Sequence, residues 1–432
     1  MFRSPVRKLG YQTRCHNPGI RWILIILFVA WISCAFLFLH SFQSVRYKML
    51  FSKKILPSIS MAVETAQPSS SLDTYLHLRS RARQAFNITD KSISMKTEKV
   101  DIPKRIRIAQ YSHVYGADPL WNDDSGAWES CGQPCEAIGG YGDASSAATA
   151  DVVVLDIQTF RSVPWARPAK QIWVGTYFES PDHYPNRKNP QIMSQFNVTM
   201  GFRPDDDLPV FNMVYDTMKG FAGITNLTLP TWEAKQARPE LMSVWISNCN
   251  TDRTHRKDIL KQLASSKISY ASYGRCWNTH SSAQGVTALT DADWRRYGSQ
   301  NLGAELVAVA AQYLFFFAAE NSDYPYYITE KVFHGLAAGS VPVYVGDAEN
   351  LKKIAPPHSI IYANDFESVG ALASHLHTVA QNPELYEQYL KWRQDSDALN
   401  KLEAMMALPA WASTHGREYA CALCEYMHAI GS

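Results

Sequence analysis

The stretch "LFFFAAENSDYPYYITEKVFHGLAAGSVPVYVG", residues 314 to 346, decides the fold. Residues 314–320 and 341–346 are short apolar runs of the kind that forms buried strands. Residues 329–338 between them have the apolar spacing of a helix. A strand, a helix and a second strand in this order form a βαβ unit, so the stretch predicts a parallel sheet that is covered by helices.

The same alternation continues along the rest of the chain. Strands are predicted at 105–112, 151–157, 171–178, 241–247 and 268–274, and a helix at 254–265. A segment rich in proline and charge, residues 229–240, interrupts this rhythm. We therefore expect an α/β protein with two αβα domains, an N-terminal one at 105–237 and a C-terminal one at 238–432.

The composition is that of a folded globular protein. Of its 432 residues, 46% are hydrophobic and 19% are charged, which excludes a disordered, collagen-like or coiled-coil chain. Residues 1–54 hold nine of the 42 basic side chains and no acidic one, which leaves 33 basic against 40 acidic side chains in residues 55–432. This larger part lacks the excess of basic residues that a nucleic-acid-binding protein needs.

Residues 22–39, "WILIILFVAWISCAFLFL", are long and apolar enough to cross a bilayer. The run is longer than the apolar core of a cleaved signal peptide and ends in bulky residues, so we interpret it as an uncleaved signal anchor. A buried helix of a soluble domain is the alternative. Five basic residues precede the run and four follow it, which favours a cytosolic tail at 1–21 and a lumenal remainder. Residues 40–104 are interpreted as a stem.

Two further features agree with a lumenal location. Asn87, Asn197 and Asn226 each begin an Asn-X-Thr glycosylation sequon. Six cysteines follow the anchor, and they permit three disulfide bonds in an oxidising compartment: Cys131, Cys135, Cys249, Cys276, Cys421 and Cys424. The short spacings favour pairs 131 with 135 and 421 with 424, leaving 249 with 276. A zinc site formed by the two close pairs is the alternative.

Two αβα domains side by side create a cleft at the carboxyl ends of their strands, where small ligands bind. Thr329 could cap the helix that begins there, and the free N–H groups of such a helix suit a phosphate. Lys331 adds a positive charge at the same point, and the carboxylate of Glu330 suits the two vicinal hydroxyls of a ribose. Spacing alone favours the plainer interpretation of Glu330 and Lys331 as solvated charges.

The same segment resembles the signature of the α1,3/4-fucosyltransferase family, in which FENS is followed by DY-[VI]-TEK and, after a helix, by AG-x-VPV. Here these blocks are residues 320–322, 327–331 and 338–346, without insertion. Further family motifs occur elsewhere in the chain, in the order in which the family has them: "YFESP" (177–181), "FNVTMGFRPDDDLP" (196–209), "ISNCN" (246–250), "SYGRC" (272–276) and "KWR" (391–393). The resemblance covers about residues 105–424. Ala319 and Tyr326 depart from the pattern, where the family has Phe and Asp.

The resemblance implies a type II Golgi enzyme of GT-B architecture, with two Rossmann-like domains facing a cleft. The N-terminal domain would lie on the acceptor side, and the C-terminal domain, with its cysteine-containing tail, would bind GDP-fucose. Such an enzyme moves fucose from GDP-fucose to the 3-hydroxyl of GlcNAc with inversion. Glu179 matches the family's proposed base, which takes the acceptor proton. The residues that match the family's donor site are Ser247, Asn248, Arg256, Arg275, Glu320, Asn321, Tyr327, Glu330 and Lys331. No metal is expected to be required for the chemical step, and Mn²⁺ or Mg²⁺ would at most stimulate it.

Two other hypotheses compete with this one. Asp205, Asp206 and Asp207 contain the Asp-x-Asp pattern with which another glycosyltransferase architecture holds Mn²⁺, although we interpret the triplet as an acidic turn. A lumenal sugar-binding protein that has lost turnover is the second hypothesis. The joint presence of Glu179, Arg256, Glu330 and Lys331 argues against it.

The acceptor is predicted from the tail of the chain. The tail after residue 393, with its terminal "CALC", and the cysteines in "ISNC" and "YGRC" look more like plant and invertebrate enzymes that fucosylate the Asn-linked GlcNAc of N-glycans than like Lewis-antigen enzymes. We therefore expect core α1,3 transfer onto the N-glycans of glycoproteins. N-acetyllactosamine is the alternative acceptor.

Overall fold

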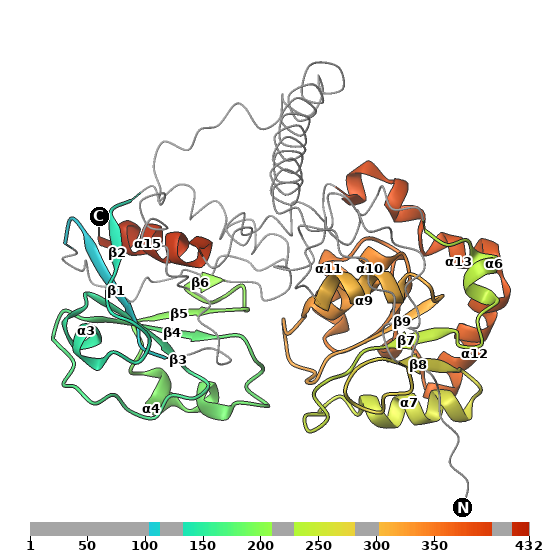
Figure 1. Cartoon of the computed structure of the whole chain (residues 1–432), viewed down its shortest axis with the longest axis horizontal. Coiled ribbons are helices and arrows are strands. Elements are labelled where there is room, and N and C mark those ends of the chain that lie inside the picture. The colour runs from blue at the N-terminus through green and yellow to red at the C-terminus, as the bar shows by residue number, and fades with distance from the viewer. Residues whose placement is uncertain (1–102, 113–132, 210–228, 281–301, 400–416, 432) are drawn as a thin grey trace, which may run out of the picture. The chain divides into compact units, whose positions relative to one another are not determined.

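A computed structural model of the chain describes residues 103–112, 133–209, 229–280, 302–399 and 417–431 (Figure 1). The predicted tail, the anchor at 22–39 and nearly all of the stem lie outside these residues. No helix among the described residues is long and apolar enough to cross a membrane. The described residues all belong to one compact unit, Pro68–Ser432.

The first sheet has six parallel strands in the order β2-β1-β3-β4-β5-β6 (Figure 1). They are β1 Ile106–Gln110, β2 Cys135–Ala137, β3 Val152–Asp156, β4 Ile172–Tyr177, β5 Val198–Gly201 and β6 Leu208–Pro209. All residues of β3 and β4 are buried. Continuous apolar runs become strands of this kind because a parallel sheet is covered on both faces.

The second sheet has five parallel strands in the order β11-β10-β9-β7-β8. They are β7 Met242–Val244, β8 Tyr270–Ser272, β9 Phe315–Ala319, β10 Val341–Val345 and β11 Ile361–Tyr362. The helix between β9 and β10 is α10, Glu330–Ala338, which ends at Gly339 with φ of 59°. Glycine adopts this left-handed conformation without strain. The βαβ unit predicted for residues 314–346 is thus confirmed.

Helices cover both faces of the second sheet. The core on one face includes side chains of α10 and of α11 Ala348–Ile354, and α9 Leu302–Ala310 packs beside α10. The core on the other face includes side chains of α7 Arg256–Ser265, α12 Val369–Gln381 and α13 Pro383–Gln388. Two parallel sheets with helical layers confirm the predicted α/β class and give a GT-B-like architecture.

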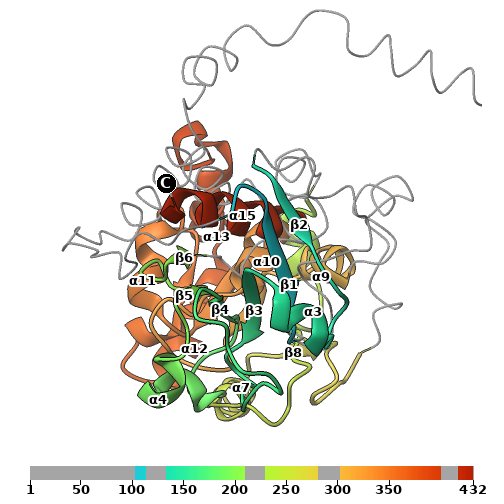
Figure 2. The same cartoon turned by 90° about the vertical axis from the view of Figure 1, so that its left-hand side faces the viewer.

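The C-terminal helix α15, Arg417–Gly431, packs on the first sheet, although we expected residues 238–432 to form one domain. Leu423, Met427 and Ile430 share a core with β1, β3, β4 and β5. Figure 2 shows α15 above the strands of this sheet. The helical cover of the first sheet is therefore completed by the last helix of the chain.

The segment at 229–240 contains α6, Trp232–Gln236, whose Lys235 donates a hydrogen bond to the carbonyl of Gly339.

The structure corrects two of the three predicted disulfide pairs. Cys135 is bonded to Cys424, with Cα atoms 6.0 Å apart, and Cys421 is also disulfide-bonded, to a partner outside the described residues. Pairing 421 with 424 was wrong because both lie on α15, where residues three apart have Cβ atoms about 5–6 Å apart, farther than a disulfide spans. The bond between Cys249 and Cys276 was predicted correctly.

The structure also decides between disulfides and zinc for this cluster. Cys135, Cys424 and His428 lie close enough to share an ion, but the two sulfur atoms are bonded to each other. Thiolates are the form of cysteine that binds zinc, so the bonded pair does not supply such ligands.

Of the three predicted sequon asparagines, Asn87 and Asn226 lie outside the described residues. Asn197 is exposed directly before β5, and its side-chain oxygen accepts a hydrogen bond from the backbone of Trp173.

Candidate active site

The carboxyl ends of β7 and β9 mark the topological switch point of the second sheet. β7 lies between β8, which follows it in sequence, and β9. Ligands of open α/β sheets bind at such points. The loop after β7 and the loop after β9 meet here, because Thr254 donates to the carbonyl of Glu320 and the amide of Arg253 donates to the carbonyl of Asn321. Most of the predicted donor-binding residues lie on these two loops.

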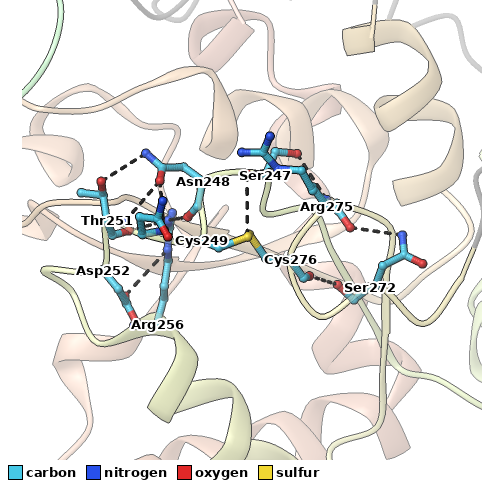
Figure 3. The surroundings of a disulfide bond; sticks show 12 residues. Ser247, Asn248, Cys249, Thr251, Asp252, Arg256, Ser272, Arg275 and Cys276 are labelled. Carbon is cyan, nitrogen blue, oxygen red and sulfur yellow. Dashed lines mark hydrogen bonds and ion pairs between the residues drawn. A yellow bond between two sulfur atoms is a disulfide. The ribbon is translucent and has the colours of Figure 1, made fainter.

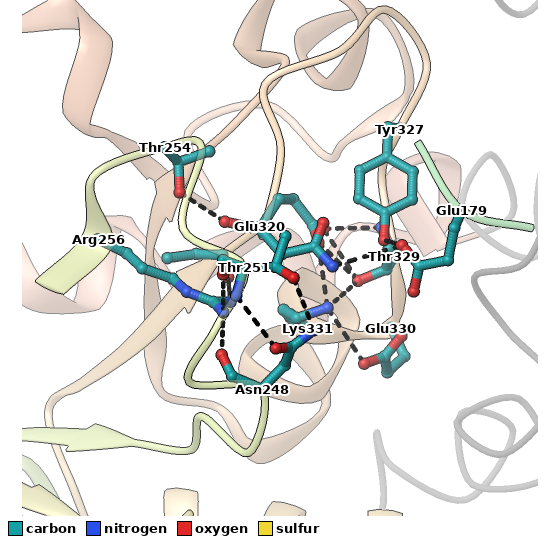
Figure 4. A network of polar contacts seen from close by, with 12 residues as sticks. Glu179, Asn248, Thr251, Thr254, Arg256, Glu320, Tyr327, Thr329, Glu330 and Lys331 are labelled. Carbon is teal, nitrogen blue, oxygen red and sulfur yellow. Dashed lines mark hydrogen bonds and ion pairs between the residues drawn. The ribbon is translucent and has the colours of Figure 1, made fainter. Parts of the chain in front are cut away.

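Glu320 holds the start of α10 (Figure 4). Its fully buried carboxylate accepts hydrogen bonds from the amide of Thr329, at 2.8 Å, and from the hydroxyl of Thr329. The prediction that Thr329 caps the helix with its side chain was therefore wrong, because its hydroxyl is bound to Glu320 and makes no capping hydrogen bond. Among the described residues no side chain caps the first turn of α10, so its N–H groups keep their capacity to bind an anion.

Lys331 lies in the same first turn and is paired with the two carboxylates of this site. Its ammonium group is 3.1 Å from Glu320 and 3.4 Å from Glu330. Burial alone would lower the pKa of Lys331, but Glu320 and Glu330 outweigh it and raise this pKa. Lys331 is therefore a permanent cation, and its side chain is 23% exposed at the uncapped end of the helix.

Glu179 follows the carboxyl end of β4 and contacts the loop between β9 and α10 (Figure 4). Its Oε2 accepts hydrogen bonds from the phenol of Tyr327, at 2.5 Å, and from the amide of Asn321, at 3.3 Å. Its Oε1 has no hydrogen-bond partner among the described residues. The backbone amide of Glu179 donates to Gln158 at 2.6 Å. Glu179 is thus held by its backbone amide and by one oxygen of its half-buried carboxylate, which leaves the other oxygen for another proton donor.

Other contacts join the same loops of the two sheets. His183, four residues after Glu179, lies 3.0 Å from the hydroxyl of Thr251 in the loop after β7. The guanidinium of Arg203 lies 5.2 Å from the centre of the Tyr326 ring. Tyr326 has a left-handed backbone with φ of 67°, and its amide donates to Asp347. These contacts place the carboxyl ends of both sheets at one site.

The loop after β7 is supported by the disulfide between Cys249 and Cys276 (Figure 3). Ser247 accepts a hydrogen bond of 3.1 Å from the side chain of Arg275, and both residues are exposed. Gly274 lies against the backbone of Ile246, where a Cβ atom would come within 2.3 Å of main-chain atoms. Glycine is therefore required in the motif "SYGRC", and the motif positions Arg275 beside Ser247.

Arg256 lies beneath this loop and is 2% exposed. Its guanidinium donates to the carbonyls of Asn248 and Thr251, at 2.6 and 2.7 Å (Figure 4). Burial lowers the pKa of Arg256, but the ordinary value for arginine is so high that the group stays charged. In this structure Arg256 fixes the shape of the loop, and direct contact between Arg256 and a ligand stays a prediction.

Each carboxylate of the aspartate triplet has partners within the protein. Asp205 is paired with Arg203 at 2.7 Å, and Asp207 accepts from the amide and hydroxyl of Thr199. Asp206 is buried, with Arg187 at 3.0 Å. Burial raises the pKa of Asp206 to about 6. These contacts are those expected of the acidic turn that we inferred from the sequence.

Two contacting residues were missed at the sequence level. The side-chain oxygen of Gln158 accepts a hydrogen bond from the backbone amide of Glu179, and the ring of His183 contacts the hydroxyl of Thr251. Neither belongs to a motif that we used. The position of Gln158 just after a predicted buried strand was the one available signal, because side chains at the carboxyl ends of parallel strands gather at ligand sites.

Two family profiles match this chain. The profile "Fucosyltransferase, N-terminal" matches residues 120–212, and "Glycosyltransferase family 10 (fucosyltransferase) C-term" matches residues 235–432. Alpha-(1,3)-fucosyltransferase 4 of Bos taurus is 32% identical over 232 residues, which are 53% of this chain and 52% of the relative. The 4-galactosyl-N-acetylglucosaminide 3-alpha-L-fucosyltransferase 9 of Rattus norvegicus is 28% identical over 263 residues, 61% of each chain.

The chain thus spans between about half and three fifths of the length of these curated relatives. Among solved structures, a crystal structure of an α1,3-fucosyltransferase with GDP-fucose aligns with 72% of this chain and 86% of that chain, at 14% identity and a TM-score of 0.42. The two matched profiles contain strands β2 to β6 and β7 to β11, so they divide the chain where the two sheets divide it. The chain belongs to glycosyltransferase family 10, the family of the fucosyltransferases.

Proposed function

We propose that this protein is an inverting α1,3-fucosyltransferase that moves fucose from GDP-fucose to the 3-hydroxyl of a GlcNAc residue. The observation that carries the proposal is the contact of Glu179 with Tyr327 and Asn321. This contact brings a carboxylate from the first sheet to the loop that leads into Lys331 and the uncapped start of α10. A base and an anion site therefore lie together, as inverting glycosyl transfer needs.

Each group has a role in this reaction. The acceptor oxygen attacks C1 of fucose from the face opposite the diphosphate, and its proton passes to Glu179. The bond between C1 and the diphosphate oxygen breaks, and GDP leaves with the electron pair. Lys331 and the N–H groups of the first turn of α10 stabilise the charge that develops on the diphosphate. The carboxylate of Glu330, 44% exposed, is placed to accept hydrogen bonds from the ribose hydroxyls.

The remaining predicted donor residues support the same site. Ser247 and Arg275 are exposed beside the start of the loop after β7 and would contact the nucleotide. Asn248 shapes this loop, since its side-chain oxygen accepts from the amide of Thr251. Arg256 and Glu320 act as positioning residues, because both are buried and bonded to the loops. No step of this scheme uses a metal ion.

Replacement of Glu179 by Gln tests the proposal. The amide keeps the size and the hydrogen bond with Tyr327 but cannot take a proton. We expect GDP-fucose to bind with unchanged affinity and transfer to fall by about 10²–10⁴-fold, the range of general base catalysis. Unchanged transfer would remove Glu179 as the base. A wild-type protein that binds GDP-fucose but transfers to no acceptor would support the alternative of an inactive sugar-binding protein.

We propose the Asn-linked core GlcNAc of N-glycans as the acceptor, on the basis of the C-terminal tail and its cysteines. The name of one relative favours a second candidate, because it gives 4-galactosyl-N-acetylglucosaminide as the acceptor. Incubation with GDP-fucose and either a GlcNAc-terminated N-glycopeptide or N-acetyllactosamine separates the two. Transfer to the glycopeptide alone supports the core acceptor, and transfer to N-acetyllactosamine alone contradicts it.

We propose that residues 22–39 anchor the protein in the Golgi membrane, with the catalytic part in the lumen. The disulfides at Cys135 and Cys249 support this, because such bonds persist in the secretory pathway. Full-length protein in sealed Golgi vesicles should resist added protease until detergent opens the membrane. Digestion of the α/β part in intact vesicles would contradict the proposed orientation.

A further inference from the structure

The motif "FNVTMGFRPDDDLP", residues 196–209, has no role in the reaction scheme above. Its central turn lies between β5 and β6 and contacts the loop after β9 through two consecutive residues. Phe202 packs edge-on against the ring of Tyr327, with centroids 5.3 Å apart. The guanidinium of Arg203 lies 5.2 Å from the centre of the Tyr326 ring. The turn therefore holds the loop of the other sheet at two neighbouring positions.

The aspartate triplet fixes the orientation of Arg203. Both oxygens of Asp205 accept hydrogen bonds from its guanidinium, at 2.7 and 2.8 Å. The buried carboxylate of Asp206 accepts from the backbone amide of Arg203 at 3.1 Å. Asp207 closes the turn, because it accepts from the amide and the hydroxyl of Thr199 on β5. A guanidinium bound by both oxygens of one carboxylate has a defined orientation, so the turn itself sets the direction of Arg203.

Phe202 is fixed as well. Its ring packs edge-on against that of Tyr177, with centroids 5.2 Å apart, and the phenol of Tyr177 donates to Asp206. Gly201, directly before Phe202, lies against the same ring, where a Cβ atom would come within 2.1 Å of it. The turn is therefore a rigid surface, held by contacts within the first sheet.

Tyr326 is a position at which this chain departs from the family pattern, which has Asp there. Its backbone is left-handed, with φ of 67°, a conformation that bulky residues rarely adopt. Such conformations persist only where surrounding contacts hold them, and they occur often at functional sites. One such contact is the hydrogen bond of 2.6 Å from the amide of Tyr326 to Asp347. The ring contact with Arg203 is another, and an aspartate would not provide it.

The contact between Arg203 and Tyr326 lies next to the partner of the proposed base. Tyr327 follows directly in the chain, and its phenol donates to the carboxylate of Glu179 (Figure 4). Within the described part of the chain Arg203 has no hydrogen bond to Glu179. An effect of Arg203 on Glu179 is therefore transmitted through the loop at 326–327.

We infer that Arg203 is a positioning residue for the transfer reaction. By holding the ring of Tyr326, its guanidinium fixes the loop from which Tyr327 orients Glu179. The inference rests on the proposed role of Glu179 as the base. A residue that only stabilises the first sheet would affect folding without affecting the rate of transfer, so the two roles differ in what can be measured.

Two variants remove the contact from its two sides. Arg203→Met removes the guanidinium and leaves the half-exposed Asp205 in contact with water. Tyr326→Leu removes the ring and gives the same test if Arg203→Met does not fold. Lys352→Met is the matched control, because Lys352 also lies over a tyrosine ring, 4.8 Å from the centre of Tyr362, within the second sheet. The kcat of transfer and the KM for GDP-fucose are measured below the unfolding midpoint of each variant.

We expect each test variant to lower kcat about three- to tenfold, the range for loss of a cation–π contact. The KM for GDP-fucose should stay within twofold, and the control should leave both constants unchanged. In a Tyr327→Phe background, Arg203→Met should lower kcat no further, because the hydrogen bond through which Arg203 acts is already absent. An equal loss in both backgrounds would overturn the inference.

The inference and the proposed function can fail separately. A wild-type kcat in Arg203→Met and in Tyr326→Leu, combined with loss of transfer in Glu179→Gln, would overturn the inference alone. Unchanged transfer in Glu179→Gln would overturn the proposed base and the inference together.

Discussion

The phenol of Tyr327, on the loop after β9 of the second sheet, donates a hydrogen bond of 2.5 Å to the carboxylate of Glu179, just past the carboxyl end of β4 in the first sheet. The two residues are 148 positions apart in the chain. Phe202 packs edge-on against the same tyrosine ring, with centroids 5.3 Å apart. The ring therefore fixes both the position of the proposed base and the contact between the loops of the two sheets.

Replacement of Tyr327 by Phe keeps the ring and removes the hydroxyl that donates this hydrogen bond. Hydrogen bonds to charged groups contribute about 1.5–3 kcal/mol, so we expect kcat to fall about 10–100-fold. The KM for GDP-fucose should change little, because the proposed diphosphate contacts are made by other residues. Tyr389→Phe is the matched control, since its hydroxyl bonds to His375 far from this loop. A wild-type kcat in the Tyr327 variant would show that the hydrogen bond does not orient the base.

Lys331 has a structural role and a proposed ligand-binding role, and a pair of variants separates them. Lys331→Met leaves the buried carboxylate of Glu320 without its cation, which costs about 3–5 kcal/mol of folding stability. The double variant with Glu320→Gln removes this unpaired charge and keeps an acceptor for Thr329. We expect the double variant to recover most of the lost thermal stability but not the affinity for GDP-fucose.

Thermal unfolding and calorimetric titration with GDP measure the two effects. Lys261→Met, at a position 64% exposed on α7, is the control for loss of a lysine charge. If the double variant bound GDP as tightly as wild type, Lys331 would be needed only to neutralise Glu320.

The sequence predicts the continuously apolar strands well and several short strands poorly. The runs that became β3 and β9 are continuously apolar, and every residue of both strands is buried. The strands β2, β6 and β11, with two or three residues each, lie at sheet edges and were not predicted, and neither was the interior strand β5, which has four residues. Strands this short carry no periodicity, so their pairing depends on the neighbouring strand rather than on their own residues.

The site shows the same limit. The resemblance pointed to Glu179 and Lys331, and the structure brings both residues to one place. The resemblance gave no sign that the guanidinium of Arg256 is buried, because a charged residue is expected at the surface unless its partners are known. Its partners are backbone carbonyls of a folded loop. Contacts of this kind exist only after folding and leave no local pattern in the sequence.

The bond between Cys135 and Cys424 joins the edge of the first sheet to the last helix across 289 positions. A peptide map without reduction should contain these two cysteines in one linked peptide pair. Closing a loop this long restricts the unfolded chain, so Cys424→Ser should lower the free energy of unfolding by about 2–5 kcal/mol. The KM for GDP-fucose should stay unchanged, because α15 packs on the other sheet. A linked peptide pair joining Cys421 to Cys424 would contradict the structure.

Lys235 provides a test in which pH changes stability. Burial, together with the nearby positive charge of Arg393, lowers the pKa of Lys235 to about 7. Above this value the folded protein has released the proton, while the unfolded chain keeps it up to the ordinary lysine pKa of about 10.4. The unfolded state therefore binds more protons between these two values, and stability from this group rises with pH there. Below about pH 7 both states are protonated and this gain is absent.

Lys235→Met should remove this pH dependence. Methionine fills a similar volume, and the carbonyl of Gly339 keeps the hydrogen bond from Tyr386. We expect the wild-type protein to gain stability relative to the variant as the pH rises from 7 to 9, by a few kcal/mol, since each pH unit between the two pKa values contributes about 1.4 kcal/mol. Urea unfolding at pH 6, 7, 8 and 9 measures the difference, with Lys261→Met as the exposed control. Parallel curves for wild type and Lys235→Met would show that the buried amine keeps its proton, and that Gly339 at the end of α10 accepts its hydrogen bond from an ammonium group throughout.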